Sequence, residues 1–125
     1  MKNILSILLL SVLFIGCSKE KVLMDNLINK GNNYSPKMYY EGELFNGIGF
    51  DIHYNDQIRF ESNFKNGKRE GLTRYWYSTG ELECEVYYKN NEKDGFSKHW
   101  DKDGELTLER EYSNGRIINQ KGNMD

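Results

Sequence analysis

A glycine-marked unit that returns at a fixed interval constrains the fold of this chain more than any other feature. Gly47, Gly71 and Gly95 mark it, since 71 − 47 and 95 − 71 are both 24. Other positions keep the same phase: Ile58, Leu82 and Leu106; Glu61, Glu85 and Glu109; Phe64, Tyr88 and Tyr112; Asn66, Asn90 and Asn114; Trp76 and Trp100; Gly80 and Gly104. A fixed period of this length is typical of stacked supersecondary units, each too small to fold alone. The repeat predicts function on a surface, without a catalytic pocket.

The N-terminus resembles a bacterial lipoprotein signal. Lys2 precedes the apolar stretch Ile4 to Ile15, which is shorter than the roughly 20 residues that span a bilayer but suits the h-region of a signal peptide. The stretch ends in Phe14-Ile15-Gly16-Cys17, which is similar to the lipobox that precedes a lipidated cysteine. We therefore expect a signal peptide over residues 1–16 and a lipid anchor on Cys17. The alternative is an ordinary cleaved signal with an incidental cysteine.

Composition narrows the classes of partner. The formal net charge is −2, and charges of both signs are interspersed, so the chain lacks the basic stripe of a nucleic-acid-binding protein. If Cys17 carries lipid, Cys84 has no cysteine partner, so we expect no disulfide to stabilise the fold. We predict a membrane-anchored protein with a protein partner, without nucleic acid and without a cofactor.

Alternating apolar and polar residues from about Met38 predict an all-β fold, an antiparallel meander with one hairpin per repeat. In the second repeat, a three-residue loop over 78–80 would place Trp76 opposite Leu82 and Leu72 opposite Val86. The repeat domain is expected over residues 38–118, between a lipidated tether over 17–37 and a C-terminal tail over 119–125. One short helix over Glu20 to Asn29, covering the first sheet edge, is compatible with the spacing of its apolar residues.

Carrying this register through the three repeats predicts one apolar face that forms the core. Its members are Ile48, Phe50, Ile52, Ile58, Phe60, Phe64, Leu72, Trp76, Leu82, Cys84, Val86, Tyr88, Phe96, Trp100, Leu106, Leu108 and Tyr112. A flat sheet would expose this face, so the sheet must curl or be covered. We expect the two tryptophans to be equivalent core residues.

Units of the form Gly71-x4-Trp76-x3-Gly80-x-Leu82-x2-Glu85-x2-Tyr88-x-Asn90 resemble the variant MORN repeat. This bacterial repeat occurs in proteins of the YwqK antitoxin family and in many short lipoproteins. The resemblance covers about residues 39–117. It implies a β-meander and implies no catalytic motif.

The sequence also bears on metal binding and catalysis. Equivalent glutamates Glu61, Glu85 and Glu109 would lie two strands, or about 9.6 Å, apart, which is too far to share one cation. His53 and His99 would lie about 19 Å apart by the same spacing. Cys84 is expected on the apolar face, away from both histidines. We therefore predict no metal site, no Cys–His pair and no enzymatic activity.

Tyrosines concentrate on the predicted polar face of the second repeat. Tyr75, Tyr77 and Tyr87 share it with His99 of the next repeat. Tyrosine is frequent at protein interfaces, and it is also a common strand residue, so both interpretations stay open.

The sequence as a whole predicts an envelope lipoprotein that acts as a non-catalytic binding or scaffold module. Delivery to the outer membrane is expected in a Gram-negative cell, because Ser18 rather than Asp follows Cys17. One alternative is an antitoxin or immunity protein that neutralises a partner toxin. Another is direct binding of lipid or glycan through the tyrosine-bearing face.

Overall fold

The computed structural model describes residues 19–122 and shows an almost all-β protein. A short N-terminal region precedes seven longer strands. It contains β1 (Lys21–Leu23), the 3-10 turn η2 (Met24–Asn26), β2 (Ile28–Asn29), β3 (Met38–Tyr40) and β4 (Glu43–Leu44). The longer strands are β5 (Gly47–Ile52), β6 (Ile58–Lys65), β7 (Lys68–Trp76), β8 (Leu82–Lys89), β9 (Glu92–Trp100), β10 (Leu106–Ser113) and β11 (Arg116–Gly122).

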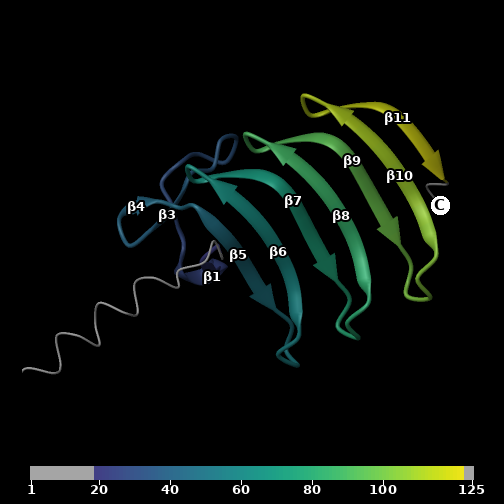
Figure 1. Cartoon of the computed structure of the whole chain (residues 1–125), viewed down its shortest axis with the longest axis horizontal. Helices are drawn as coiled ribbons and strands as arrows, with labels where there is room; N and C mark the ends of the chain where they lie inside the picture. Colours follow the sequence, from purple (N-terminus) through teal and green to yellow (C-terminus); the bar gives the residue numbers. More distant parts are fainter. Residues whose placement is uncertain (1–18, 123–125) are drawn as a thin grey trace, which may run out of the picture.

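The longer strands form an antiparallel meander, as predicted. The main sheet has the order β1-β5-β6-β7-β8-β9-β10-β11, and β2, β3 and β4 form a small second sheet. Figure 1 shows that the long strands bow in the same direction, so the sheet is a curved single layer with the N-terminal elements at one end. Within residues 19–122, no helix is long and apolar enough to cross a membrane.

The turns recur with the spacing of the glycine marks. Asn66, Asn90 and Asn114 have φ of 51°, 48° and 48° in the return turns. Their backbone N–H groups donate to side-chain oxygens of Asn46, Glu70 and Asp94 respectively, which are themselves one repeat apart. Each return turn is thus hydrogen-bonded to the repeat that precedes it, which aligns successive repeats.

The hairpin register corrects the predicted faces. Trp76 pairs with Leu82 as predicted, but a bulge at Glu83 then shifts the register, so Leu72 pairs with Tyr87 instead of Val86. The predicted register assumed that partners keep an even sum of residue numbers along the whole hairpin. Beyond the bulge, the numbers of two paired residues add up to an odd value, as in Thr73–Val86. The two-residue return turns impose the same odd sum on the strands that they connect. Odd-numbered residues of β5, β7 and β9 therefore share a face with even-numbered residues of β6, β8 and β10.

We call the buried side of the sheet the inner face and the other side the outer face. Of the predicted apolar face, Phe60, Phe64, Cys84, Val86, Tyr88, Leu108 and Tyr112 lie on the inner face, whereas Ile48, Phe50, Leu72 and Phe96 lie on the outer face. Phe96 is 49% exposed. The remaining six pair at the hairpin ends as Ile52–Ile58, Trp76–Leu82 and Trp100–Leu106. The two tryptophans hold equivalent positions, as predicted, but each is only partly buried at a hairpin end and neither belongs to the buried core.

A polar row runs through the middle of the inner face. Ser62, Thr73 and Ser97 are 0–1% exposed, and the Ser62 and Thr73 hydroxyl oxygens are 2.6 Å apart. Ser62 pairs with Thr73, Thr73 with Val86, and Val86 with Ser97. Small side chains at these positions let larger neighbours on the curved sheet close over them. The centre of the inner face is thus held by a hydroxyl pair as well as by apolar packing.

The N-terminal segment caps the first edge of the sheet as strand and turn, so the predicted helix over 20–29 is wrong. β1 pairs in parallel with β5, and Val22 and Leu27 join Phe45 and Phe64 in the hydrophobic core. The segment therefore covers the first edge, as expected, but part of the predicted tether belongs to the folded domain. At the other end, β11 continues to Gly122, so residues 119–122 of the predicted tail are strand.

The outer face carries a ladder of alternating charge. Register places Glu61 opposite Arg74, Arg74 opposite Glu85, Glu85 opposite Lys98, Lys98 opposite Glu109 and Glu109 opposite Lys121. Nitrogen–oxygen distances are 2.9 Å for Arg74–Glu85 and 3.5 Å for Lys98–Glu109. The glutamates therefore alternate with cations, whereas Gly49, Thr73 and Ser97 are on the inner face.

Candidate functional site

Cations stacked on aromatic rings line the inner face beyond the N-terminal cap, the name we give to the segment from β1 to β4. The Arg69 guanidinium lies 5.2 Å from the Tyr88 ring centroid and 5.4 Å from that of Phe60. One repeat later, the Lys93 ammonium lies 5.1 Å from the Tyr112 ring. Such contacts favour a cation above a ring by about 0.5–2 kcal/mol, depending on solvation. We call Arg69, Tyr88, Lys93 and Tyr112 the cation–aromatic steps.

The equivalent position under the cap is apolar. Phe45 precedes Arg69 by one repeat, and Phe64 precedes Tyr88 by the same interval. These two phenylalanine rings pack 5.6 Å apart in the hydrophobic core. The same stacking position is thus filled by a phenylalanine where the cap covers the inner face and by a cation where the face is open. Burial dictates this exchange, because a buried unpaired cation is costly.

A hollow of about 200 Å³ opens beside Arg69. It is lined by Met24, Pro36, Met38, Phe64, Arg69 and Asn91. Methionine side chains adapt to irregular ligand shapes, and the guanidinium can bind anions bidentately. The hollow therefore joins the cap to the first cation–aromatic step and extends the candidate site.

The inner face from β7 to β11 is cationic. Besides Arg69 and Lys93 it contains Arg110, which pairs with Ser97 and donates from Nε to the Gln120 side-chain oxygen at 2.8 Å. Among the described residues, no carboxylate occupies a paired position of this face between β7 and β11. The acidic residues of these strands lie on the outer face, near the hairpin ends or, for Glu83, at the bulge of β8. This separation makes the inner face suited to anionic groups.

The structure brings Cys84 and His99 together, which corrects the prediction that they are apart. They are register partners on β8 and β9, and Sγ of Cys84 lies 3.6 Å from Nε2 of His99. The same Nε2 lies 3.2 Å from the Ser97 hydroxyl. The odd register set by the return turn places an odd-numbered histidine opposite an even-numbered cysteine.

Burial keeps this pair neutral. It raises the pKa of the Cys84 thiol from 9.0 to about 11 and lowers the pKa of His99, to which the charges of Arg110 and Lys93 contribute. A nucleophilic cysteine needs the opposite shifts, toward a thiolate beside an imidazolium. The geometry resembles a catalytic pair, but its electrostatics disfavour the reactive ionic form.

We expect Cys84 to react slowly in the native protein. The rise of its pKa to about 11 leaves about a hundredfold less thiolate at pH 7.5 than an ordinary thiol has. Iodoacetamide labelling followed by peptide mass spectrometry should show slow modification of Cys84 when folded and rapid modification in urea. Rapid labelling of the folded protein at neutral pH, slowed by His99→Ala, would instead reveal an activated thiolate.

The tyrosines that the sequence places on one face are separated. Tyr75 lies on the inner face, 5.0 Å from the Phe60 ring, and burial raises its pKa. His99 lies on the same face, because Cys84 pairs with Tyr75 on one side and with His99 on the other. Tyr87 is 46% exposed on the outer face. Tyr77 lies beyond the end of β7, where its hydroxyl donates to the Trp100 carbonyl at 2.8 Å.

His53 makes the bond that Tyr77 makes one repeat later. Its Nε2 lies 2.7 Å from the carbonyl oxygen of Trp76, so this nitrogen carries the hydrogen. These two side chains connect neighbouring hairpins at the end of the sheet opposite the return turns. Their role in the described structure is to position the stack.

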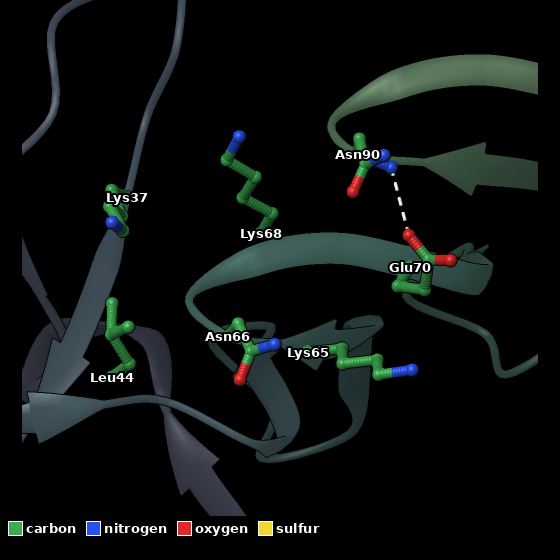
Figure 2. A pocket seen from close by; sticks show the side chains of 7 residues that line it. All are labelled: Lys37, Leu44, Lys65, Asn66, Lys68, Glu70 and Asn90. Atoms are coloured by element: carbon green, nitrogen blue, oxygen red, sulfur yellow. Dashed lines mark hydrogen bonds between the residues drawn. The ribbon is translucent and has the colours of Figure 1, made fainter.

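A second hollow, of about 430 Å³, lies at the return turns. Figure 2 shows Lys68 extending between Lys37 and Asn90, while Lys65 extends toward the side of Glu70; Leu44 and Asn66 complete the lining. The Glu70 carboxylate accepts the backbone N–H of Asn90 at 2.9 Å. This surface is also rich in lysine, but it lacks aromatic stacking and belongs to the turn connections.

No cluster of three or more His, Cys, Asp or Glu side chains within residues 19–122 is arranged to hold a metal ion. Cys17, the predicted lipidation site, lies outside the described residues. Sequence reasoning missed the cation–aromatic steps. Their signal was present in the repeat spacing of Phe45, Arg69 and Lys93, but it becomes meaningful only once the register is known.

Comparison with known proteins adds no relative to this description. No protein-family model, no curated protein and no solved structure matches the chain.

Proposed function

We propose that this protein is a lipid-anchored, non-catalytic binding module of the cell envelope that holds an acidic protein partner on its inner face. The cation–aromatic steps carry the proposal. They repeat along the sheet at the same interval as the turns, and they begin where the N-terminal cap ends. The MORN-like pattern and the lipobox-like N-terminus support a repeat scaffold attached to a membrane through Cys17, the outer membrane in a Gram-negative cell.

The arrangement favours an extended ligand over a small one. Neighbouring strands lie about 4.8 Å apart, so equivalent steps two strands apart are about 9.6 Å apart. Carboxylates at alternate residues of an extended chain have a spacing of about 6.8 Å, and the flexible side chains of glutamate, arginine and lysine can make up the remaining difference of about 2.8 Å. Half-buried cations beside rings retain hydrogen-bond capacity for such carboxylates. The inner face is therefore suited to an acidic segment that crosses the strands.

Lys93→Ala should reduce recovery of the partner, and Lys98→Ala provides a matched control. Both lysines are on β9, but Lys93 stacks on the inner face whereas Lys98 belongs to the outer ladder. Affinity capture from solubilised membranes, quantified by mass spectrometry, should show partners lost with Lys93→Ala and with Arg69→Ala. These partners should be retained with Lys98→Ala, although each variant changes the net charge equally. Equal loss with both lysine variants would indicate unspecific charge attraction and contradict the inner-face site.

Replacing Cys17 with Ala should release the protein from membranes. The expected anchor is two or three acyl chains on this cysteine, and more than one chain is needed for stable attachment. The variant should move to the soluble fraction after cell lysis, and metabolic labelling with a fatty-acid analogue should be lost. Retention in the membrane after high-salt and carbonate washing would show that another element holds the protein there.

A further inference from the structure

The two ends of the main sheet are finished differently. At the first end, the three-residue strand β1 and the N-terminal core cover the long strand β5. At the other end, β11 spans seven residues, all of them exposed, and within residues 19–122 β10 is the one strand that pairs with it. Ile117 and Ile118 are 51% and 60% exposed there. A long edge strand presents unpaired backbone N–H and C=O groups to any strand that can dock.

The outer charge ladder ends on a cation at this edge. From Glu61 the ladder alternates in sign at every strand up to Lys121, which faces Glu109 on one side. Opposite charges directly across neighbouring strands stabilise pairing by about 0.2–1 kcal/mol, and like charges oppose it. The next strand of this pattern would place a carboxylate beside Lys121.

A second copy of the chain is a poor occupant of the edge. The charged residues of β11 are Arg116 and Lys121, so two β11 strands paired about a two-fold axis would bring only cations together. Head-to-tail stacking would place β11 beside β1, whose charged residue is Lys21. Neither arrangement places a carboxylate opposite Lys121, which continuation of the alternating charges would require.

We propose that β11 is a docking edge for an extended acidic segment of a different protein, which adds as an antiparallel ninth strand with a Glu or Asp opposite Lys121. Backbone hydrogen bonds would supply the affinity, as in other cases of strand addition, and the charge would set the register. The exposed isoleucines offer apolar contact to β-branched residues of the added strand. This edge is separate from the cation–aromatic steps, so its failure would leave the inner-face proposal untouched.

The probe is an octapeptide with the sequence of residues 106–113, Leu-Thr-Leu-Glu-Arg-Glu-Tyr-Ser, because β10 is the acidic strand that β11 already accepts on its other side. A control peptide replaces the glutamate equivalent to Glu109 with lysine. A second control is N-methylated at alternate residues, which removes backbone donors without changing charge. Binding to the full chain is followed by NMR through the shifts of the β11 amides.

The acidic peptide should shift the β11 amides, and the N-methylated peptide should not. Lys121→Glu should weaken the acidic peptide by about fivefold or more and strengthen the lysine peptide by a similar factor, as expected of a cross-strand charge pair. Lys121→Gln, which leaves no like charge beside Glu109, should weaken the acidic peptide less. Three outcomes would overturn the proposal: shifts outside β11, indifference to Lys121→Glu, or light scattering showing a dimer whose β11 amides are protected from exchange.

Discussion

Phe45→Ala should destabilise the protein by about 3–5 kcal/mol, the cost of truncating a large aromatic side chain in a packed core. Phe45 is 2% exposed, and its ring lies 5.6 Å from that of Phe64 and 6.2 Å from that of Tyr40. Its loss would open a cavity between the N-terminal cap and the sheet. Urea denaturation followed by circular dichroism measures the free energy of unfolding directly.

Trp76→Ala is the informative comparison. This larger side chain is only half-buried at a hairpin end, so its truncation should cost only about 1–2 kcal/mol. The sequence pattern alone predicted a core tryptophan at this position. If Trp76→Ala proved more costly than Phe45→Ala, the main core would lie along the hairpin ends and not under the N-terminal cap.

Thr73→Val should destabilise the protein by about 1–3 kcal/mol, because it leaves the buried Ser62 hydroxyl without its partner. The substitution nearly conserves shape and removes one hydroxyl from a site that is 0% exposed. The two oxygens are 2.6 Å apart, so one hydroxyl donates a hydrogen bond to the other in the native protein. Thermal and urea unfolding should both show the loss.

The double variant Ser62→Ala with Thr73→Val separates the hydroxyl pair from packing. Replacing both partners with apolar groups can be nearly neutral, so the double variant should be more stable than Thr73→Val alone. A double-mutant cycle then gives the coupling energy between the hydroxyls. Simple addition of the two single effects would show that the pair does not interact in solution.

The sequence was sufficient for the elements that local chemistry dictates. The alternation of residues predicted the β-meander, and Asn66-Gly67, Asn114-Gly115 and Gly80 are residue types suited to the positive φ that they adopt in the turns. The pairing of Trp76 with Leu82 followed from the length of the loop alone. These features depend on residues close together in the chain, so a short-range pattern contains the information.

Tertiary structure decided which side of each strand is buried. One extra residue, Glu83, reverses the face of the rest of β7, and it places Thr73 and Tyr75 inside and Leu72 outside. No composition rule distinguishes these positions, because both faces carry aromatic residues. The odd register of the return turn brought Cys84 to His99, and the bulge spread the predicted tyrosine cluster over different parts of the sheet.

The N-terminal segment shows the same division between local and long-range information. The apolar residues Val22, Leu23, Leu27 and Ile28 have the partial spacing of a helix, yet β1 and η2 form instead. β1 completes the edge of β5, and Val22 and Leu27 are buried with Phe45 and Phe64. The sequence by itself determined the class of fold, the repeat and its turns. Only the tertiary structure decided the register, the buried face and hence the site, since each depends on strands that meet far from one another in the chain.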